Sequence, residues 1–525
     1  MDYLIHHSLL TNADRSPDKV ALIHKDKRLT YAQVADRSTG LARGLRTLGV
    51  EPGDRVGIFL DASIAQVISI FSISQAGGVF VPINTLLFPD QVAHIVNDCR
   101  MKGLITTSSK LSGIVSRIEI LPSLKFIVLV DGEECEDVPV PTYLLEDISL
   151  PSDSSRGLDN RIGLDLAALL YTSGSTGKPK GVMLNHSQII AGTTIVSEYL
   201  NITPCDRILA VLPFSFDAGL NQLTTAIQQG ATTVLINFIF AREIVKTLLQ
   251  EEITGLAGVP TLWSLLVQPS SSLHQFRYPH LRYITNTGGA IRQSVLESLR
   301  QILQDTQIFL MYGLTEAFRS TYLPPEELDR RPTSIGKAIP NTEILIVNEA
   351  GEPCKPGEIG ELVHRGPTVS MGYWNQLELT DQFLKPHPFL PDELSGVEKV
   401  CYSGDLVKKD EEGFIYFVGR RDTMIKSSGF RISPTEVEEA LMLSGMLRDA
   451  AVVGIPDERL GQSVKAFVVR KEGVPFDPEG LLSFCAGRLP AYMIPKQIAE
   501  LESLPQTSSG KVDYPALLVK ECLES

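Results

Sequence analysis

The sequence predicts an α/β protein, with a large N-terminal region of parallel-rich sheets covered by helices and a small mobile α+β C-terminal domain. Short runs of consecutive apolar residues recur along the chain, and stretches with helical spacing separate them. Runs that are apolar without alternation indicate strands covered on both faces, which is typical of parallel sheets. A change in the character of the chain near Tyr402 predicts the C-terminal part.

The first elements of the N-terminal region follow a helix, strand, helix, strand order. Thr30 and Gln33 form a capping box ahead of a helix with one apolar face, and Gly49 ends that helix. The next predicted elements are a buried strand at 56–60, a helix at 63–76 and a strand at 79–81. These last three make a βαβ unit, whose helix joins two parallel strands. Further apolar runs predict strands at 126–130, 166–171, 208–212 and 232–236.

The C-terminal region begins with a short strand-like segment at 414–418, a charged turn and a helix with a strong start signal. The turn has the sequence Gly419-Arg420-Arg421-Asp422, and the helix begins with Ser433-Pro434-Thr435-Glu436. We therefore expect an N-terminal domain at 1–421, built from subdomains, and a C-terminal lid domain at 422–525. The polar turn suits a hinge, although a simple surface turn has the same composition.

Composition and charge exclude several classes of protein. The chain has 525 residues, of which 43% are hydrophobic and 21% charged, as in globular proteins rather than collagen or disordered chains. Its 48 basic and 62 acidic residues give a net charge of −14, which makes non-specific binding to nucleic acid or anionic membranes unfavourable. No run approaches the roughly 18 apolar residues of a membrane span. The seven cysteines are scattered and form no CxxC pair, so we expect a cytoplasmic protein without a cysteine metal site.

A loop rich in glycine and hydroxyl side chains follows the strand predicted at 166–171. It has the sequence Tyr171-Thr172-Ser173-Gly174-Ser175-Thr176-Gly177-Lys178-Pro179-Lys180-Gly181. Its glycines let the backbone approach an anion, its hydroxyls and amides donate hydrogen bonds, and its lysines supply charge. It is not a Walker A loop, because Thr172 and Pro179 stand where that motif needs a glycine and a hydroxyl. The loop predicts a phosphate site; the alternative, a flexible linker, fits its lysines and the preceding strand less well.

This loop resembles the phosphate loop of the AMP-forming adenylating enzymes, the superfamily of acyl-CoA synthetases, firefly-type luciferases and nonribosomal-peptide adenylation domains. Other motifs of the family follow in its order and cover nearly the whole chain. They are Gly288-Gly289-Ala290, Tyr312-Gly313-Leu314-Thr315-Glu316, Gly360-Glu361-Leu362 with Arg365-Gly366, Tyr402-Ser403-Gly404-Asp405, Gly419-Arg420-Arg421-Asp422, Lys426-Ser427-Ser428-Gly429-Phe430-Arg431 and Ser509-Gly510-Lys511. The chain is most similar to a stand-alone AMP-dependent acyl-CoA ligase.

The resemblance implies ATP and Mg²⁺ as cofactors of a reaction in two halves. A carboxylate attacks the α-phosphate of ATP to give an acyl-adenylate and pyrophosphate, and a thiol of coenzyme A or phosphopantetheine then takes the acyl group. The ATP-binding residues that it implies are Thr172, Ser173, Gly174, Ser175, Thr176, Gly177, Gly288, Gly289, Ala290, Tyr312, Gly313, Asp405, Arg420 and Arg431. In this set the loop holds the β- and γ-phosphates, Tyr312 stacks on adenine, and Asp405 accepts the ribose hydroxyls with Arg420 alongside.

The catalytic residues that the resemblance implies are Lys511, Thr315, Glu316 and Lys180. Thr315 contacts the α-phosphate, Glu316 holds Mg²⁺, and Lys180 binds the leaving pyrophosphate. Lys511 bridges the carboxylate and the α-phosphate, where negative charge concentrates in the transition state. Without the motifs, Tyr312 reads as a core aromatic, and Glu316 and Lys511 as solvated surface charges.

The resemblance also implies that the small domain rotates between the two half-reactions. Asp422 then occupies the hinge, and the face near Gly429 turns toward the thiol. One departure from the family is Tyr514, which stands where a basic residue often follows the catalytic lysine. This departure leaves the local packing open and changes no catalytic role.

The expected substrate pocket contains Phe216, Asp217, Ala218, Asn221 and Arg319. Phe216 takes the gate position, and the pair Phe216-Asp217 resembles amino-acid adenylation domains, whose aspartate binds an α-ammonium group. Asp217 is also a natural N-cap for a helix at 218–229, in which case Asp217, Ala218 and Asn221 share one face. Arg319 could bind a second carboxylate of the substrate, although an ion pair with Glu316 at i, i+3 is the simpler alternative.

We therefore predict an ATP-dependent, AMP-forming ligase that activates a small or medium carboxylic acid and transfers it to a pantetheine thiol, most simply that of coenzyme A. One alternative is a stand-alone enzyme that adenylates an amino acid for a separate carrier protein. A second alternative is a non-catalytic nucleotide-binding homologue, and a luciferase-type oxygenase would also adenylate first. No nucleic-acid partner and no membrane span are expected.

Overall fold

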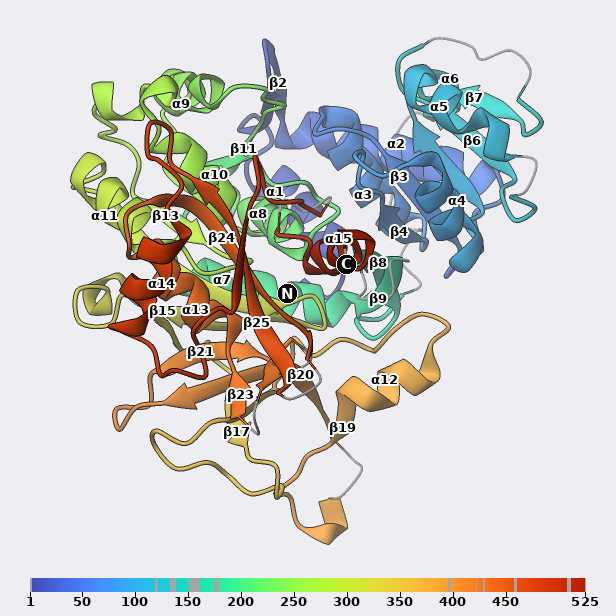
Figure 1. The fold of residues 1–525 in the computed structure, drawn as a ribbon. Coiled ribbons are helices and arrows are strands. Elements are labelled where there is room, and N and C mark those ends of the chain that lie inside the picture. Colours follow the sequence, from blue (N-terminus) through green and yellow to red (C-terminus); the bar gives the residue numbers. More distant parts are fainter. Residues whose placement is uncertain are drawn as a thin grey trace. The chain divides into compact units, whose positions relative to one another are not determined.

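A computed structural model describes residues 2–118, 121–132, 138–150, 161–173, 179–394, 398–421, 423–427, 430–457, 460–507 and 511–524. The chain divides into two compact units, shown in Figure 1. The first unit contains Met1–Ile344 and His364–Cys401, and the second contains Leu345–Val363 and Tyr402–Ser525. The domain boundary after residue 421 stays a prediction.

The first sheet of the first unit has the order β16-β15-β14-β13-β12-β10-β11-β1-β2. Its strands are β1 (Val20–His24), β2 (Lys27–Thr30), β10 (Arg207–Ala210), β11 (Thr232–Leu235), β12 (Gly255–Gly258), β13 (Tyr283–Asn286), β14 (Gln307–Leu314), β15 (Ala317–Leu323) and β16 (Ser334–Ala338). Neighbouring strands from β14 to β1 are parallel, whereas β2, β15 and β16 pair antiparallel. The carboxyl ends of the parallel strands therefore share one edge of the sheet.

The second sheet has the order β7-β6-β5-β3-β4-β8-β9. Its strands are β3 (Arg55–Phe59), β4 (Val79–Pro82), β5 (Gly103–Thr106), β6 (Phe126–Leu129), β7 (Thr142–Leu144), β8 (Leu166–Ser173) and β9 (Pro179–Asn185). All its pairs are parallel except β8 with β9, which flank the predicted phosphate loop. The predicted α/β fold with parallel-rich sheets is confirmed.

Helices cover the sheets of the first unit (Figure 1). They are α1 (Ile5–Arg15), α2 (Tyr31–Thr47), α3 (Ile64–Gln75), α4 (Pro89–Asp98), α5 (Ser108–Ile118), α6 (Leu145–Ile148), α7 (His186–Tyr199), α8 (Asp217–Gln228), α9 (Ala241–Gln250), α10 (Pro260–Leu266), α11 (Gln293–Ile302) and α12 (Leu377–Phe383). One core packs α2, α3 and α8 against both sheets through residues such as Leu41, Phe71 and Leu220. A second core packs α4 and α5 on the second sheet through Val92 and Leu111. The apolar strands are thus covered on both faces, as predicted.

The helix α2 begins at the capping box that the sequence predicted, and α3 also begins at a capping side chain. The Thr30 hydroxyl accepts a hydrogen bond from the Gln33 amide at 3.3 Å, and the Gln33 side chain accepts one from the Thr30 amide at 3.0 Å. Gly49 follows the end of this helix at φ +84°, a left-handed conformation that favours glycine. Ser63 caps α3 by accepting from the Gln66 amide at 3.2 Å.

The second unit is a mixture of sheets and helices. It contains most of β17 (Glu343–Val347), β18 (Gly360–Arg365) and β20 (Lys399–Lys409) and all of β21 (Ile415–Arg420), paired in the order β17-β18-β20-β21. The strand β19 (Leu384–Pro386) lies in the first unit and pairs with the first residues of β20, Lys399–Cys401, which the division also places there. A further sheet has the order β23-β22-β25-β24, with strands β22 (Ile425–Ser427), β23 (Phe430–Ile432), β24 (Leu447–Asp457) and β25 (Gly461–Arg470), and β26 (Gln497–Glu500) pairs with β25. Its helices are α13 (Pro434–Met442), α14 (Pro478–Ala486) and α15 (Tyr514–Glu524).

The sheet of β22 to β26 carries helices on both faces. Val437 of α13 and Leu481 of α14 pack in one core, and Leu517 of α15 packs with Phe467 in another. Ser433 caps α13 as predicted, because its hydroxyl accepts from the Glu436 amide at 3.3 Å. The predicted small α+β part is confirmed. In the described stretches of both units, every helix is too short or too polar to cross a membrane.

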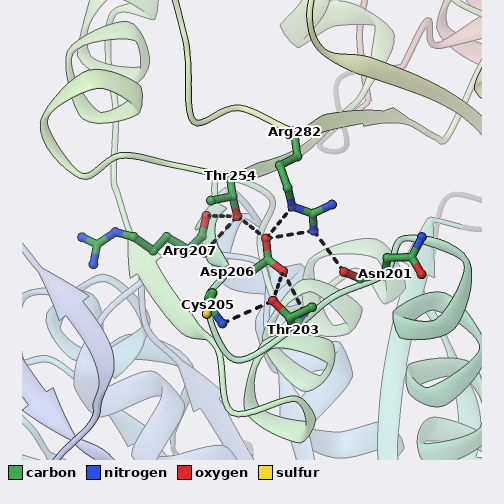
Figure 2. Close-up of polar contacts among 7 residues, drawn as sticks. All are labelled: Asn201, Thr203, Cys205, Asp206, Arg207, Thr254 and Arg282. Carbon is green, nitrogen blue, oxygen red and sulfur yellow. Dashed lines mark hydrogen bonds and ion pairs between the residues drawn. The ribbon is translucent and has the colours of Figure 1, made fainter.

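The amino ends of three parallel strands are tied together by the buried carboxylate of Asp206 (Figure 2). Asp206 precedes β10, Thr254 precedes β12 and Arg282 precedes β13. The Asp206 carboxylate accepts from the Thr254 hydroxyl at 2.6 Å, the Arg282 Nε at 2.9 Å, and the Thr203 amide and hydroxyl at 2.7 and 3.0 Å. Because Asp206 is only 2% exposed, these donors replace the water that the carboxylate loses on folding.

Candidate active site

The predicted site residues of the first sheet gather at the carboxyl ends of its parallel strands. Phe216 follows β10, Gly288 follows β13, and Glu316 follows β14. The connections from β10 lead to β11 on one side, and β12 lies on the other side, so the direction of winding reverses between β10 and β12. In open parallel sheets, ligands bind outside the carboxyl ends of the strands at such a reversal.

The phosphate loop begins at the carboxyl end of β8 in the second sheet. The antiparallel register places Thr172 directly opposite Lys180. The Tyr171 hydroxyl donates to Asp98 at 2.6 Å and so fixes the strand just before the loop. Ser173 ends β8. Four other predicted residues, Gly174, Ser175, Thr176 and Gly177, lie outside the described residues.

The glycine turn after β13 has a backbone that other residues would strain. Gly288 has φ +79°, in the left-handed region. The Asn286 side-chain amide donates to the Gly289 carbonyl at 2.9 Å, which closes the turn on itself. A Cβ at Gly289 would lie 3.4 Å from Pro260, the first residue of α10. Ala290, which follows, is exposed.

The strand β14 delivers the half-buried segment from Tyr312 to Glu316 to the same edge. A bulge interrupts the pairing of β14 with β15 after Tyr312, and Gly313 fits there because a Cβ would lie 3.0 Å from the Arg319 Cα. Thr315 and Glu316 form the turn between the two strands. Glu316 is held from two sides, since its carboxylate accepts a hydrogen bond from the Tyr373 hydroxyl and its carbonyl accepts one from the Ser370 amide at 2.8 Å.

Tyr373 is a site residue that sequence reasoning missed. It is 6% exposed, and its ring packs edge-on against Phe383 with centroids 5.6 Å apart. It lies 57 residues beyond Glu316, and no spacing pattern links the two. No local signal in the sequence marks Tyr373, because only the fold brings its hydroxyl to the Glu316 carboxylate.

The start of α8 corrects the interpretation of Asp217 as a helix cap. The N-cap is Phe216, because its carbonyl accepts the first helical bond, from the Leu220 amide at 2.9 Å. Asp217 is the first residue inside the helix, is half-buried and has no capping hydrogen bond to the backbone. Helix capping therefore does not occupy the Asp217 carboxylate.

The predicted shared face of α8 includes two buried residues, Ala218 at 7% and Asn221 at 2% exposure. The Asn221 Nδ2 has no hydrogen-bond partner among the described residues, and neither does the Ser215 hydroxyl just before the helix. Buried donors are almost always paired in folded proteins. Unpaired donors beside a strand end are places where a bound molecule can supply the missing acceptor.

The interpretation of Arg319 as an ion-pair partner of Glu316 is wrong. Glu316 lies in the turn before β15 and Arg319 lies in the strand, so the two residues do not share the helix face that an i, i+3 pair requires. Arg319 is 3% exposed, and its Nη1 donates instead to the Thr287 hydroxyl at 3.1 Å. Thr287 directly precedes Gly288, so the guanidinium lies at the carboxyl end of β13 beside the glycine turn. Arg319 also has φ +71°, which costs about 1–3 kcal/mol for a residue other than glycine.

A buried histidine supports the backbone around Arg319. His364 Nδ1 lies 2.9 Å from the Ser320 hydroxyl, and its Nε2 lies 3.0 Å from the Thr368 hydroxyl. Burial lowers the pKa of His364 to about 3, so its ring is neutral at ordinary pH. Thr368 in turn donates to the Arg319 carbonyl at 3.4 Å. The histidine thus fixes this strand without adding positive charge.

The remaining predicted site residues belong to the second unit. Asp405 is 6% exposed and pairs across β20 and β21 with Arg420, whose Nη1 lies 3.4 Å from its Oδ1. Lys511 is exposed, and its backbone exchanges hydrogen bonds with Thr507 at 2.7 and 3.3 Å. Arg431 lies in β23 opposite Lys426. Asp422 and Gly429 lie outside the described residues.

Two family descriptions match the chain. That of the AMP-binding enzymes matches residues 9–374, and that of the AMP-binding enzyme C-terminal domain matches residues 436–511. The chain belongs to the AMP-binding enzyme family. The match of this family to the first unit includes the phosphate loop, the glycine turn and the segment from Tyr312 to Glu316.

Curated relatives of this AMP-binding enzyme include peptide synthetases and a CoA ligase. It is 32% identical to gramicidin S synthase 2 of Brevibacillus brevis over 96% of the chain but only 11% of that protein. It is 29% identical to a long-chain-fatty-acid–CoA ligase of Salmonella typhimurium over 95% of the chain and 91% of the relative. The chain spans between 6% and 44% of the gramicidin and tyrocidine synthases that it matches.

Solved structures similar to this AMP-binding enzyme include CoA ligases. An anthranilate CoA ligase in complex with anthranoyl-AMP superposes with a TM-score of 0.87 at 26% identity, covering 99% of this chain and 97% of the ligase. The o-succinylbenzoate CoA synthetase of Bacillus subtilis in complex with its acyl-adenylate gives a TM-score of 0.83 at 27% identity, covering 97% of each chain. The likeness therefore extends over both units.

Proposed function

We propose that this protein is an ATP-dependent, AMP-forming ligase that joins a carboxylic acid to the pantetheine thiol of coenzyme A through an acyl-adenylate. The observation that carries the proposal is the gathering of the glycine turn, Tyr312, Glu316 and the start of α8 at the carboxyl ends of β10, β13 and β14. The similarity to CoA ligases, one of them in complex with an acyl-adenylate, supports it.

In the first half-reaction, a carboxylate oxygen of the acid forms a bond to the α-phosphorus of ATP, and the bond to pyrophosphate breaks. Thr172 and Lys180, which face each other across β8 and β9, are placed to bind the leaving pyrophosphate together with the loop between them. Tyr312 would stack on adenine against the glycine turn. Thr315 would hold the α-phosphate by its hydroxyl. In the second half-reaction the thiol sulfur bonds to the acyl carbon, and AMP leaves.

Glu316 is the residue that fits Mg²⁺. Magnesium prefers carboxylate oxygens and phosphate oxygens as ligands. Glu316 is half-buried and pinned by Tyr373 and Ser370, so its carboxylate is held in place before a ligand arrives. Bound there, Mg²⁺ would neutralise charge on the phosphates during the displacement.

The second unit would supply the ribose contact and the catalytic lysine. Asp405 would accept the ribose hydroxyls, with Arg420 holding its carboxylate. Lys511 would bridge the acid's carboxylate and the α-phosphate, and its exposure fits a residue that meets its partners only when substrates are bound. Asp422 would serve as the hinge of a domain at 422–525, and Gly429 would lie on the thiol side. The cytoplasm is the proposed location.

The test is a screen for AMP release with fatty, aryl, dicarboxylic and amino acids, with coenzyme A added or withheld. We expect AMP and an acyl-CoA thioester with at least one acid. Absence of AMP with every class of acid would contradict the proposal. A strict requirement for an α-amino group, with no thioester on coenzyme A, would favour an amino-acid adenylating enzyme that loads a carrier protein.

The variant Lys511→Ala tests the assignment of the catalytic lysine. We expect ATP–pyrophosphate exchange to fall at least about a hundredfold, because the transition-state charge loses its cation, while ATP binding changes little. The control is Lys471→Ala, which removes another exposed lysine of the second unit. Exchange at the wild-type rate in Lys511→Ala would refute this role.

A further inference from the structure

Two arginines are buried among the residues that the structure describes, and they differ in one respect. Arg331 is 7% exposed, and its Nη1 pairs with the carboxylate of Glu327. Arg319 is 3% exposed and pairs with no carboxylate in the described residues. Its Nη1 donates to the Thr287 hydroxyl, and its Nε has no partner there.

A buried guanidinium without a counter-charge is costly for the fold. The guanidinium stays charged at any ordinary pH, so the cost cannot be relieved by losing a proton. The Arg319 guanidinium contacts the Thr287 hydroxyl, and its carbonyl accepts from the Thr368 hydroxyl, which pairs with the neutral His364; none of these groups carries negative charge. The left-handed backbone of Arg319 at φ +71° adds strain. Both features destabilise the free protein, as is typical of residues whose missing counter-charge or hydrogen bond a bound ligand supplies.

The position of Arg319 in the fold indicates which kind of ligand supplies its missing counter-charge. Arg319 lies on β15 at the carboxyl-end edge, three residues after Glu316 and bonded to the residue before the glycine turn. This edge also contains the unpartnered donors of Ser215 and Asn221. The group that binds here therefore belongs to a molecule in the adenylation site, and a carboxylate matches the planar fork of a guanidinium with two parallel hydrogen bonds.

We infer that the acid activated by this enzyme carries a second carboxylate, and that Arg319 binds it. The inference rests on the proposed ligase function, in which the first carboxylate reacts near Glu316. Arg319 is then a specificity-determining residue. A site built around a buried charge rejects an analogue that lacks the matching group, because the charge would stay unpaired in the complex.

The experiment compares acids that differ only by a second carboxylate. The pairs are succinate with butyrate, glutarate with pentanoate, adipate with hexanoate, and isophthalate with 3-methylbenzoate. AMP release by the full chain gives kcat/KM for each acid. We expect at least one diacid to exceed its methyl-ended partner by a hundredfold or more. In Arg319→Met, the diacid should lose a hundredfold or more while the partner acid changes less than threefold, and Arg319→Lys should keep part of the preference.

The matched control is Arg331→Met, which removes the other buried arginine and leaves the adenylation site intact. Its diacid preference should equal that of the wild type. A wild-type enzyme that activates the methyl-ended acids as well as the diacids would overturn the inference. An equal loss for both members of a pair in Arg319→Met would also overturn it, because Arg319 would then act on a group that all acids or ATP share.

Isothermal calorimetry of the preferred diacid without ATP separates this inference from the proposed function. We expect binding to the wild type and to Arg331→Met, and at least tenfold weaker binding to Arg319→Met. If no acid yields AMP but a diacid binds in this Arg319-dependent manner, the ligase proposal fails and the carboxylate site stands. If no diacid of the panel binds and none is activated, both fail.

Discussion

In the first sheet, the hydrogen bonding of buried polar groups differs between the amino ends and the carboxyl ends of the parallel strands. At the amino ends, the Asp206 carboxylate accepts hydrogen bonds from Thr203, Thr254 and Arg282 (Figure 2). Thr203 lies in the loop before β10, and Thr254 and Arg282 directly precede β12 and β13. At the carboxyl ends, the Arg319 Nε and several other buried polar atoms have no hydrogen-bond partner among the residues that the structure describes. The other atoms are the Ser215 Oγ, the Asn221 Nδ2 and the Asn286 Oδ1.

The difference indicates that buried polar groups at the amino ends stabilise the fold, whereas those at the carboxyl ends serve ligand binding. A buried group that the fold satisfies contributes free energy to folding, and its removal leaves its partners unpaired. A buried group that the fold leaves unsatisfied lowers stability and is retained where a ligand completes it. We therefore expect substitutions at the amino ends to reduce the free energy of unfolding, and substitutions at the carboxyl ends to reduce activity.

The largest stability effect is expected for Asp206→Ala. The Asp206 carboxylate is 2% exposed and connects the residues that precede three strands. Its removal should lower the free energy of unfolding by about 3 kcal/mol, because the Arg282 guanidinium and the Thr203 and Thr254 hydroxyls lose their acceptor. Urea unfolding at neutral pH measures this loss. Below the unfolding transition, kcat and KM should stay within about twofold of the wild type.

The control for Asp206 is Asp329→Ala. Asp329 also pairs with an arginine, Arg300, but its side chain is 74% exposed. We expect a change of about 1 kcal/mol or less, because water screens exposed ion pairs. If Asp206→Ala unfolds no more easily than this control, or loses AMP formation while still folded, the division between the two ends is wrong.

The half-buried carboxylate of Glu438 in the second unit sharpens the comparison, because among the described residues it has hydrogen-bond donors but no cation. Glu438 accepts from the Val452 amide at 2.8 Å and the Tyr514 hydroxyl at 2.9 Å. Burial raises the pKa of Glu438 to about 7, against the lowering effect of these two bonds. Neutral donors alone thus do not hold this carboxyl ionised.

The raised pKa of Glu438 gives a signed prediction for pH. In the unfolded chain this carboxyl ionises near its ordinary pKa of 4.5, while in the folded protein it keeps its proton to about 7. The stability that the protonated form contributes is therefore fully present below pH 4.5 and is lost as pH rises through the folded pKa of about 7, by about 2–3 kcal/mol between pH 5 and 8. Thermal unfolding of the wild type and of Glu438→Gln between pH 5 and 8 should differ by this slope, and the exposed Glu472→Gln should follow the wild type. Identical slopes for wild type and Glu438→Gln would exclude the raised pKa.

Local features of the fold were predictable, because their partners are close in the sequence. The capping pairs predicted at Thr30 and Ser433 each join residues three positions apart. The start of α8 was predicted one residue too late, since Phe216 rather than Asp217 accepts the first helical bond. An acidic residue near a helix start serves equally well at the cap or in the first turn, so residue type alone does not fix the boundary.

The long-range contacts were not predictable, because only the folded sheet creates them. The Asp206 carboxylate meets Thr254 and Arg282, which lie 48 and 76 residues away. Helical spacing suggested a pair between Glu316 and Arg319, but Glu316 lies in a turn and Arg319 in a strand, and each has a distant partner, Tyr373 and Thr287. The motifs thus indicated which residues gather at the site, and tertiary structure decided how each is held.

The smallest effects come from removing one hydroxyl at each end of the strands. At the carboxyl end, Tyr373→Phe frees the Glu316 carboxylate from its donor. We expect a roughly tenfold fall in kcat for AMP formation and a higher apparent Mg²⁺ requirement, because the carboxylate is no longer held in place, with a loss of stability below about 1 kcal/mol. At the amino end, the 0% exposed Tyr31 donates to the Ala231 carbonyl at 2.6 Å, just before β11, so Tyr31→Phe makes the same chemical change.

The two tyrosine variants therefore form a matched pair with opposite outcomes. Tyr31→Phe should lower the free energy of unfolding by about 1 kcal/mol and leave the Mg²⁺ dependence unchanged, since its hydroxyl donates to the backbone carbonyls of Ala226 and Ala231. Magnesium titrations of AMP release, run beside urea unfolding of both variants, make the comparison. A Tyr373→Phe enzyme with unaltered Mg²⁺ dependence and the same stability loss as Tyr31→Phe would mean that its hydroxyl serves the fold, and that Glu316 needs no positioning partner.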